Sequence, residues 1–216
     1  MRRLGKAVLV VATLLLVYLA VVAWWAAASV DTLLAQRPAG TALRLTHSQR
    51  AILLRIEDPT FFSHRGLSLA DGQGVATISS AVARDLFLYG PPLDGVKGRL
   101  QGFYRAVFDC CRKVDLGRDT MALVLDASAS KARQLDLHVG GVYMGRHEGR
   151  QLRGLEQGAQ ACIGKPLATL DDDQMARLVA MIKAPNELHP LRNRAPYELR
   201  LARVRAVLAG RCRPSG

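Results

Sequence analysis

A short stretch, residues 57–66, holds the residue types best suited to acid–base chemistry in this chain of 216 residues. It sets the carboxylates of Glu57 and Asp58 before two phenylalanines and His64, at the end of an expected helix. A carboxyl group beside apolar rings can have a raised pKa, which suits a general acid or base. The same residues also fit a solvated acidic pair at a helix C-terminus, with His64 in a turn. Composition alone favours that second interpretation.

The N-terminal segment indicates that most of the chain lies outside the cytoplasm. Residues 7–30 are apolar and uncharged, and at about 1.5 Å per residue they can cross a hydrocarbon core of about 30 Å. A basic tail, residues 1–6, precedes this run, so the positive-inside rule places the tail in the cytoplasm. Trp24 and Trp25 are expected at the far membrane interface. A cleaved signal peptide is the alternative, although its apolar core usually has about 7–15 residues.

We therefore expect a cytoplasmic tail (1–6), a transmembrane anchor (7–30), a linker (31–44) and one domain (45–212). Beyond the tail, 27 Lys and Arg residues stand against 18 Asp and Glu residues. A basic exported domain beside a bilayer favours an anionic partner, such as a lipid headgroup, a pyrophosphate or a cell-wall polymer. A merely soluble basic surface fits the same charge, and nucleic acid is not expected in that compartment.

Apolar periodicity and cap residues predict a mainly α domain without a strong strand pattern. Helices are expected near residues 52–56, 79–88, 103–114, 121–125, 130–139, 155–163, 171–182 and 196–208. No Cys/His spacing of a metal site is present. The four cysteines are expected to be buried free thiols: Cys110, Cys111, Cys162 and Cys212.

The order of residues in several segments resembles family 51 glycosyltransferases, the peptidoglycan glycosyltransferases of penicillin-binding proteins and their monofunctional relatives. Residues 57–66 are similar to the signature E-D-x-x-F-x-x-H-x-G. Five further segments follow in that family's order. Residues 74–88 resemble G-G-S-T-I-T-Q-Q-L-A-K-N-L-F-L, and residues 112–123 resemble an R-K-x-x-E helix. Residues 130–145 resemble S-K-x-x-I-L-E-L-Y-L-N-x-V-Y-F-G, residues 154–165 resemble G-x-E-x-A-A-x-x-Y-F-G-K, and residues 183–190 resemble K-A-P-S-x-Y-N-P. The resemblance spans about residues 45–210.

This resemblance implies a lysozyme-like helical domain with two lobes and a cleft, behind a single transmembrane helix in the bacterial inner membrane. The implied reaction polymerises lipid II, a disaccharide-pentapeptide on undecaprenyl pyrophosphate, into glycan strands outside the cytoplasm. The implied partners are lipid II, the growing strand and the membrane, with penicillin-binding transpeptidases and divisome or elongasome proteins beside them. Some members of that family use Mg or Mn with the pyrophosphate, but no metal-ligand cluster stands out in this sequence.

The resemblance also assigns roles to residues. Glu57 matches the general base that deprotonates the acceptor sugar hydroxyl, which attacks the anomeric carbon of the donor and inverts it. Positive charge must stabilise the leaving pyrophosphate. The implied substrate-binding residues are Asp58, Thr77, Arg84, Arg112, Lys113, Lys131 and Glu156. For each basic residue a solvated surface charge is the alternative, and Glu156 fits a helix cap as well as a cleft wall.

The chain departs from the family's pattern in three places. The glutamate of the third motif has no equivalent, and Asp119 or Asp115 is the available substitute. An aspartate is one methylene shorter, and small misplacements reduce catalysis strongly. Only a few residues separate Gly66 from Gly74, where the family has a longer segment, and Gly140 stands in place of an asparagine. We count Asp119 with Glu57 among the catalytic candidates.

Three functions are therefore weighed, in this order. The first is an active glycosyltransferase. The second is a non-catalytic relative that binds lipid II or the cell wall as a scaffold, as the missing glutamate suggests. The third is a lysozyme-like glycan hydrolase with Glu57 as the general acid. No Ser-x-x-Lys penicillin-binding domain is expected after Gly216, so cross-linking is expected from a partner.

Overall fold

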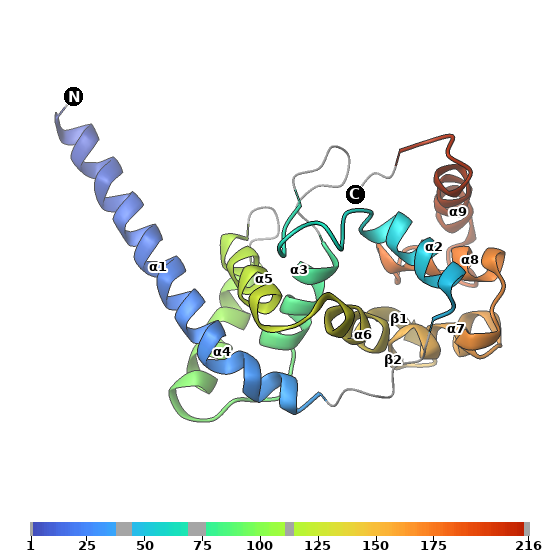
Figure 1. The fold of residues 1–216 in the computed structure, drawn as a ribbon, viewed down its shortest axis with the longest axis horizontal. Helices are drawn as coiled ribbons and strands as arrows, with labels where there is room; N and C mark the ends of the chain where they lie inside the picture. The colour runs from blue at the N-terminus through green and yellow to red at the C-terminus, as the bar shows by residue number, and fades with distance from the viewer. Residues whose placement is uncertain (1, 38–44, 69–76, 111–114, 214–216) are drawn as a thin grey trace.

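The computed structural model describes residues 2–37, 45–68, 77–110 and 115–213, and they form a mainly helical protein (Figure 1). The elements are α1 (Arg2–Ala35), α2 (His47–Glu57), α3 (Ile78–Ala83), the π-helical turn η1 (Arg84–Leu88), α4 (Gly95–Cys110), α5 (Leu116–Ser128), α6 (Lys131–Gly141), β1 (Tyr143–His147), β2 (Arg150–Arg153), α7 (Leu155–Ile163), the 3-10 turn η2 (Leu167–Thr169), α8 (Asp172–Ile182) and α9 (Arg194–Leu208).

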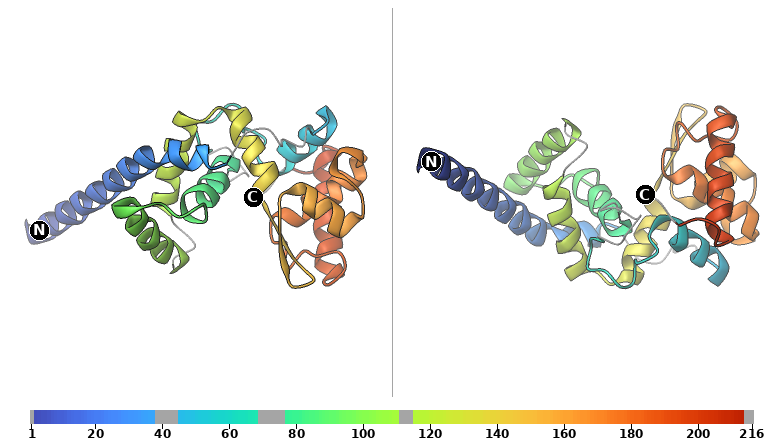
Figure 2. Two further views of the ribbon diagram at one scale, coloured as in Figure 1. Left: turned by 90° about the horizontal axis from the view of Figure 1, so that it is seen from below. Right: turned by 90° about the horizontal axis from the view of Figure 1, so that it is seen from above.

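The helices gather into two lobes, which Figure 2 shows from two sides. One lobe packs α3, α4, α5 and η1 around the second half of α1, and the other packs α2, α7, α8 and α9 together. Helix α6 joins them, because it contacts α3 in the first lobe and α7 in the second. The expected mainly α, two-lobed architecture is confirmed.

Helix α1 is long and apolar enough over Leu4–Ala35 to cross a membrane, by length and composition. Its last turns belong to the domain, because the face formed by Val22, Trp25, Ala26, Val30 and Leu33 is buried. The spacing of three and four residues puts these side chains on one stripe of the helix.

The expectation that both tryptophans lie at a membrane interface is wrong for Trp25. Its ring is fully buried against Phe87 and Tyr104, and its indole N–H donates to the carbonyl of Lys97 at 3.0 Å. Trp24, one position earlier, points away from that stripe and is 60% exposed. Two adjacent helical residues differ by about 100° around the axis, so one indole can pack in the core while the other cannot.

Helix starts follow the sequence closely. Thr46 caps α2 through a capping box with Gln49, and Asp171 caps α8 through the same arrangement with Gln174. In each case the cap side chain accepts a hydrogen bond from the third helical N–H, and the third side chain bonds back to the cap N–H. The cap at Thr46 fixes the start of α2, and the helix ends at Glu57 with Asp58 as its C-cap.

The antiparallel pair of β1 and β2 was not expected from the sequence. Its turn residues Glu148 and Gly149 have positive φ angles of 50° and 78°, as a two-residue hairpin turn requires. The strands are only five and four residues long, too short for a clear period of two. The thiols of Cys162 and Cys212 are free as expected, but neither is fully buried, because Cys162 is half-buried and Cys212 is exposed.

Candidate active site

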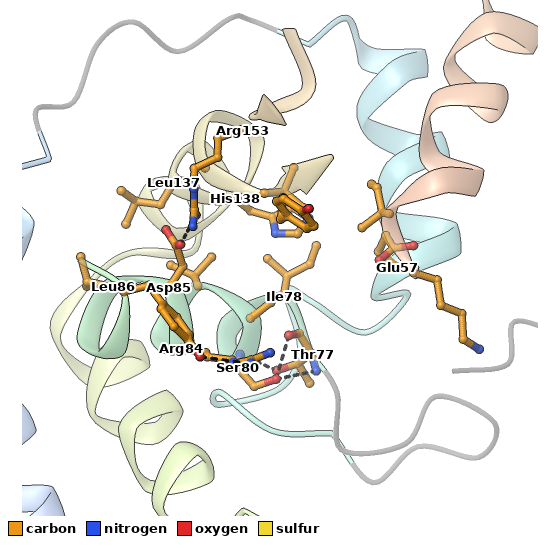
Figure 3. Close-up of a pocket in the computed structure, with 18 of the residues that line it drawn as sticks. Glu57, Thr77, Ile78, Ser80, Arg84, Asp85, Leu86, Leu137, His138 and Arg153 are labelled. Carbon is orange, nitrogen blue, oxygen red and sulfur yellow. Dashed lines mark hydrogen bonds and ion pairs between the residues drawn. The ribbon is translucent and has the colours of Figure 1, made fainter. Parts of the chain in front are cut away.

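An open cleft of about 610 Å³ lies between the two lobes (Figure 3). Its lining comes from the end of α2, from α3 and η1, from α6 and the hairpin, and from α8 and α9. Glu57 projects into it from one side, and Arg84, Asp85 and Arg153 lie on the opposite side. The cleft is therefore assembled from segments far apart in sequence.

Glu57 is the last residue of α2, and its carboxyl group has an unusual pKa. Burial raises that pKa from 4.5 to about 7, the positive charges of Arg200 and Lys183 oppose the rise, and Asp58 adds to it. At neutral pH the group therefore exchanges readily between its protonated and ionised forms. A carboxyl in this state suits a general base.

Asp58, the next residue, is fully buried and connects two elements beside the cleft. Its Oδ2 accepts a hydrogen bond from the N–H of Ile78 at 2.9 Å and lies 3.0 Å from Nε2 of His64. These contacts fasten the end of α2 to the start of α3. Asp58 does not line the cleft, so its placement supports an internal role rather than contact with a substrate.

Gly66 packs closely against the backbone of α5 and is hydrogen-bonded to Thr77. Gly66 has a φ of +89°, and a Cβ added there would lie 2.7 Å from the carbonyl oxygen of Ala122, so no other residue fits without strain. Its own carbonyl accepts a 2.6 Å hydrogen bond from the hydroxyl of Thr77, which also caps α3. Thr77 lines the cleft, and its hydroxyl is engaged by this hydrogen bond; its predicted contact with a substrate stays a prediction.

Positive charge dominates the cleft lining. Only two carboxylates, Glu57 and Asp85, occur among its described residues, and Asp85 is ion-paired with Arg37 at 3.1 Å and with Arg153 at 2.6 Å. The basic residues of the lining are Arg37, Arg84, Arg118, Arg153, Lys183 and Arg200. Such a surface attracts an anion.

Of the basic residues predicted from the sequence, Arg84 lies in the cleft, with its guanidinium 5.4 Å from the ring centroid of Tyr89. Lys131 does not line the cleft: its Nζ is 2.6 Å from a carboxylate oxygen of Asp126, and it also contacts Ser79 and the ring of Phe61. The predicted residues Arg112 and Lys113 lie outside the described residues.

The two substitutes for the missing glutamate both lie on the first turn of α5, outside the cleft lining. Asp115 caps α5 by accepting from the N–H of Arg118, and Asp119 lies 3.6 Å from the Arg118 guanidinium. Burial raises the pKa of Asp119. Arg118 itself lines the cleft, so α5 presents a guanidinium there. A catalytic role for Asp119 stays a prediction.

Glu156 connects two elements away from the cleft lining. Its carboxylate accepts hydrogen bonds from the N–H of Leu167 at 2.9 Å and from the side chain of Gln160 at 3.1 Å. These bonds tie α7 to η2, whereas a helix cap or a cleft wall was expected for this residue.

Sequence reasoning missed Arg37, Arg118, Arg153, Lys183 and Arg200 as cleft residues. Lys183 stands in a segment similar to K-A-P-S-x-Y-N-P, so a signal for it was present. Arg118 stands in the segment 112–123, which is similar to an R-K-x-x-E helix, although that pattern does not mark its position. For Arg37, Arg153 and Arg200 the sequence holds no such signal, because tertiary packing brings them to the cleft. Within the described ranges, no cluster of three or more His, Cys, Asp or Glu side chains could hold a metal ion.

Replacing Lys131 by Met should lower stability. The change leaves the partly buried Asp126 carboxylate without its cation and removes the contact with Ser79, at a cost of about 1–3 kcal/mol. The free energy of unfolding from urea titration measures this, with Lys165→Met at an exposed lysine as the control. Equal stability of the two variants would show that Lys131 does not hold the fold.

The sequence is similar to proteins of one known family. A match to the transglycosylase family covers residues 68–210. The chain is 28% identical over 155 residues to penicillin-binding protein 1B of Escherichia coli (strain K12), which covers 65% of this chain and 16% of that protein. It is 29% identical over 154 residues to penicillin-binding protein 1B of Vibrio cholerae, covering 65% and 18%.

Penicillin-binding protein 1A of Pseudomonas aeruginosa is 27% identical over 155 residues, covering 65% of this chain and 16% of that protein. The matched region thus spans less than a fifth of each of these relatives. The family match begins after residues 57–66, so the assignment of Glu57 rests on the motif and on the geometry above.

Proposed function

Because this chain belongs to the transglycosylase family, we propose that it is a peptidoglycan glycosyltransferase that polymerises lipid II into glycan strands. The observation that carries the proposal is the pairing of one carboxyl, with a pKa of about 7, with a cleft otherwise rich in cations. A base for a sugar hydroxyl and positive charge for a pyrophosphate are the two groups that this reaction needs.

In the proposed mechanism Glu57, in its ionised form, takes the proton from the acceptor sugar hydroxyl. The hydroxyl oxygen then forms a bond to the anomeric carbon of the donor sugar on the face opposite the leaving group. The bond between that carbon and the pyrophosphate oxygen breaks, and undecaprenyl pyrophosphate leaves with the electron pair. The anomeric centre is inverted, and the glycan grows by one disaccharide.

The cleft arginines supply the charge that the leaving group needs. Arg84 on η1 and Arg118 on α5 both line the cleft, and neither is paired with Asp85, which holds Arg37 and Arg153. Arg118 lies 3.6 Å from a carboxylate oxygen of Asp119 and 4.0 Å from one of Asp115, and neither of these carboxylates lines the cleft. A guanidinium can bind phosphate oxygens through two parallel N–H bonds. We assign the pyrophosphate to Arg84 and Arg118.

The described lining does not suit a divalent cation held by the protein. Mg and Mn prefer carboxylate and carbonyl oxygen ligands, whereas both oxygens of Asp85 are engaged by arginines and Glu57 has a raised pKa. We therefore derive no step through a bound cation.

Replacing Arg84 or Arg118 by Gln should weaken binding of undecaprenyl pyrophosphate about tenfold, which corresponds to about 1.4 kcal/mol. The loss should shrink as salt rises, because salt screens the charge. Equilibrium binding in detergent measures it, with Arg50→Gln on the exposed face of α2 as the matched control. If all three variants bind equally, the pyrophosphate is not held by these arginines.

We also propose that α1 is a single-pass anchor with its basic tail in the cytoplasm and the cleft outside. The support is the apolar span Leu4–Ala35 and the basic residues before it. Because the end of α1 packs on α5 and η1, this anchor would hold the cleft near the bilayer. In spheroplasts, a membrane-impermeant thiol reagent should label the exposed Cys212 but not a Cys212→Ser variant.

We propose further that the growing strand is the product partner and that penicillin-binding transpeptidases cross-link it. The function itself is tested with purified protein, labelled lipid II and the variant Glu57→Gln. The proposal predicts polymer from the unaltered protein alone. Lipid II binding without polymer would instead support a scaffold, and release of muropeptides from finished cell wall would support a hydrolase.

A further inference from the structure

Helix α9 brings a guanidinium to the same cleft as Glu57. Arg200 lines the cleft, and α9 packs against α2, the helix that ends in Glu57. Arg200 is half-buried, and its Nε is enclosed without a hydrogen-bond partner among the described residues. A buried donor left without a partner is unfavourable, so this placement calls for an electrostatic reason.

The other arginines of α9 are placed differently. Arg205 bonds the carboxylate of Asp173 at 2.6 Å, Arg194 lies 3.8 Å from Glu198, and Arg203 is exposed. Along α9, which is described over its whole length, Arg200 is the arginine in the cleft lining. It also lies outside every segment that resembles a family signature.

We propose that Arg200 is a positioning residue that keeps the Glu57 carboxyl in its ionised, proton-accepting form. The proposal rests on the proposed role of Glu57 as the general base. Glu57 is half-buried, and a guanidinium in the same cleft stabilises the carboxylate over the carboxylic acid. Arg200 thus counteracts the enclosure that would otherwise leave the base protonated at neutral pH.

The charged groups that act electrostatically on Glu57 come from three elements: Asp58 directly after α2, Lys183 directly after α8, and Arg200 from α9. Burial and Asp58 raise the pKa of Glu57, while Arg200 and, to a smaller extent, Lys183 lower it. Removing the positive charge of Arg200 should therefore raise the pKa of Glu57 further and favour its protonated form.

The test is a direct titration of Glu57. The chain has five glutamates, at positions 57, 148, 156, 187 and 198, so carbon-13 labelling of glutamate side chains gives a small set of carboxyl signals. The Glu57 signal is assigned by its loss in Glu57→Gln. Titrations then compare Arg200→Gln, Arg200→Ala, Arg200→Lys and the control Arg203→Gln, which removes an exposed cation from the same helix.

Both neutral variants should raise the Glu57 midpoint by about one pH unit, because the opposing charge of Arg200 is removed while burial and Asp58 continue to raise the pKa. Arg200→Lys should restore most of the shift, and Arg203→Gln should leave the midpoint in place. An unchanged midpoint in either folded neutral variant overturns the proposal. The second neutral variant covers the case in which the first does not fold.

Polymerisation kinetics give the matching functional readout. The rising limb of the rate against pH should move upward with the Glu57 midpoint, with a roughly fivefold lower rate at pH 7 and recovery at higher pH. A purely structural role would lower the rate equally at every pH, and that result also overturns the proposal. Failure of the unaltered protein to polymerise would instead overturn the proposed function, since the titration does not depend on turnover.

Discussion

Replacing Glu57 by Gln should reduce the rate of glycan polymerisation by about 10²–10⁴-fold, because glutamine cannot accept the proton of the acceptor hydroxyl. Binding of lipid II should remain, since the amide occupies nearly the same volume and the cationic side of the cleft is unchanged. The measurement is the initial rate of polymer formation from labelled lipid II, together with equilibrium binding. A variant that polymerises at the normal rate would remove Glu57 from the mechanism.

The same change should stabilise the protein at high pH. The folded-state pKa of Glu57, about 7, lies above the 4.5 of an unperturbed glutamate, so the folded protein binds this proton more tightly than the unfolded chain. The ionised carboxyl therefore reduces stability as pH rises from about 4.5 through about 7. Gln has no such charge, and Glu57→Gln should gain about 2–3 kcal/mol at pH 8 and little at pH 4.

Urea titrations at the two pH values measure this difference, with Glu187→Gln at an exposed glutamate as the control. If Glu57→Gln is less stable than the unaltered protein at pH 8, the ionised Glu57 carboxylate stabilises the folded state instead of destabilising it. Activity and stability are thus expected to change in opposite directions at this residue.

Replacing Asp58 by Ala should destabilise the fold by about 2–6 kcal/mol, because two enclosed groups each lose a hydrogen-bond partner at a cost of about 1–3 kcal/mol. The change leaves the N–H of Ile78 at the start of α3 and the ring of His64 without their shared carboxylate. Glu57 would then lose the anchor beside it, so activity should fall as well.

Urea titration of Asp58→Ala and Asp58→Asn measures this effect. The asparagine keeps one acceptor oxygen and should lose less stability than the alanine. If both variants unfold at the same urea concentration as the unaltered protein, Asp58 does not hold α2 to α3. Its predicted role as a substrate ligand would then have to be tested instead.

Local features of the fold could be predicted because their causes are local. The caps at Thr46 and Asp171 and the glycine after α7 are signals within a few residues of the helix ends that they define. The Glu57 segment was found for the same reason, since its aromatic, acidic and glycine positions lie within one stretch. Trp25 was misplaced because an apolar run alone does not reveal which stripe packs on a domain.

The composition of the cleft was harder to predict, since contacts across the chain decide it. Lys131 on α6 is ion-paired with Asp126 on α5 and does not line the cleft. Arg118 does line the cleft, and it lies on α5, where a carboxylate was expected. Arg37 and Arg153 meet only through Asp85. Sequence spacing identifies candidates for a charged site, but packing in the folded state decides which side chains reach the cleft.

The most direct test of the account is the pH dependence of polymer formation from labelled lipid II by the unaltered protein. Glycan chains should accumulate, and their initial rate should rise through about pH 7 as Glu57 ionises, then level off. No polymer at any pH, or a rate that does not change across this range, would contradict the assignment of Glu57 as the base of a peptidoglycan glycosyltransferase.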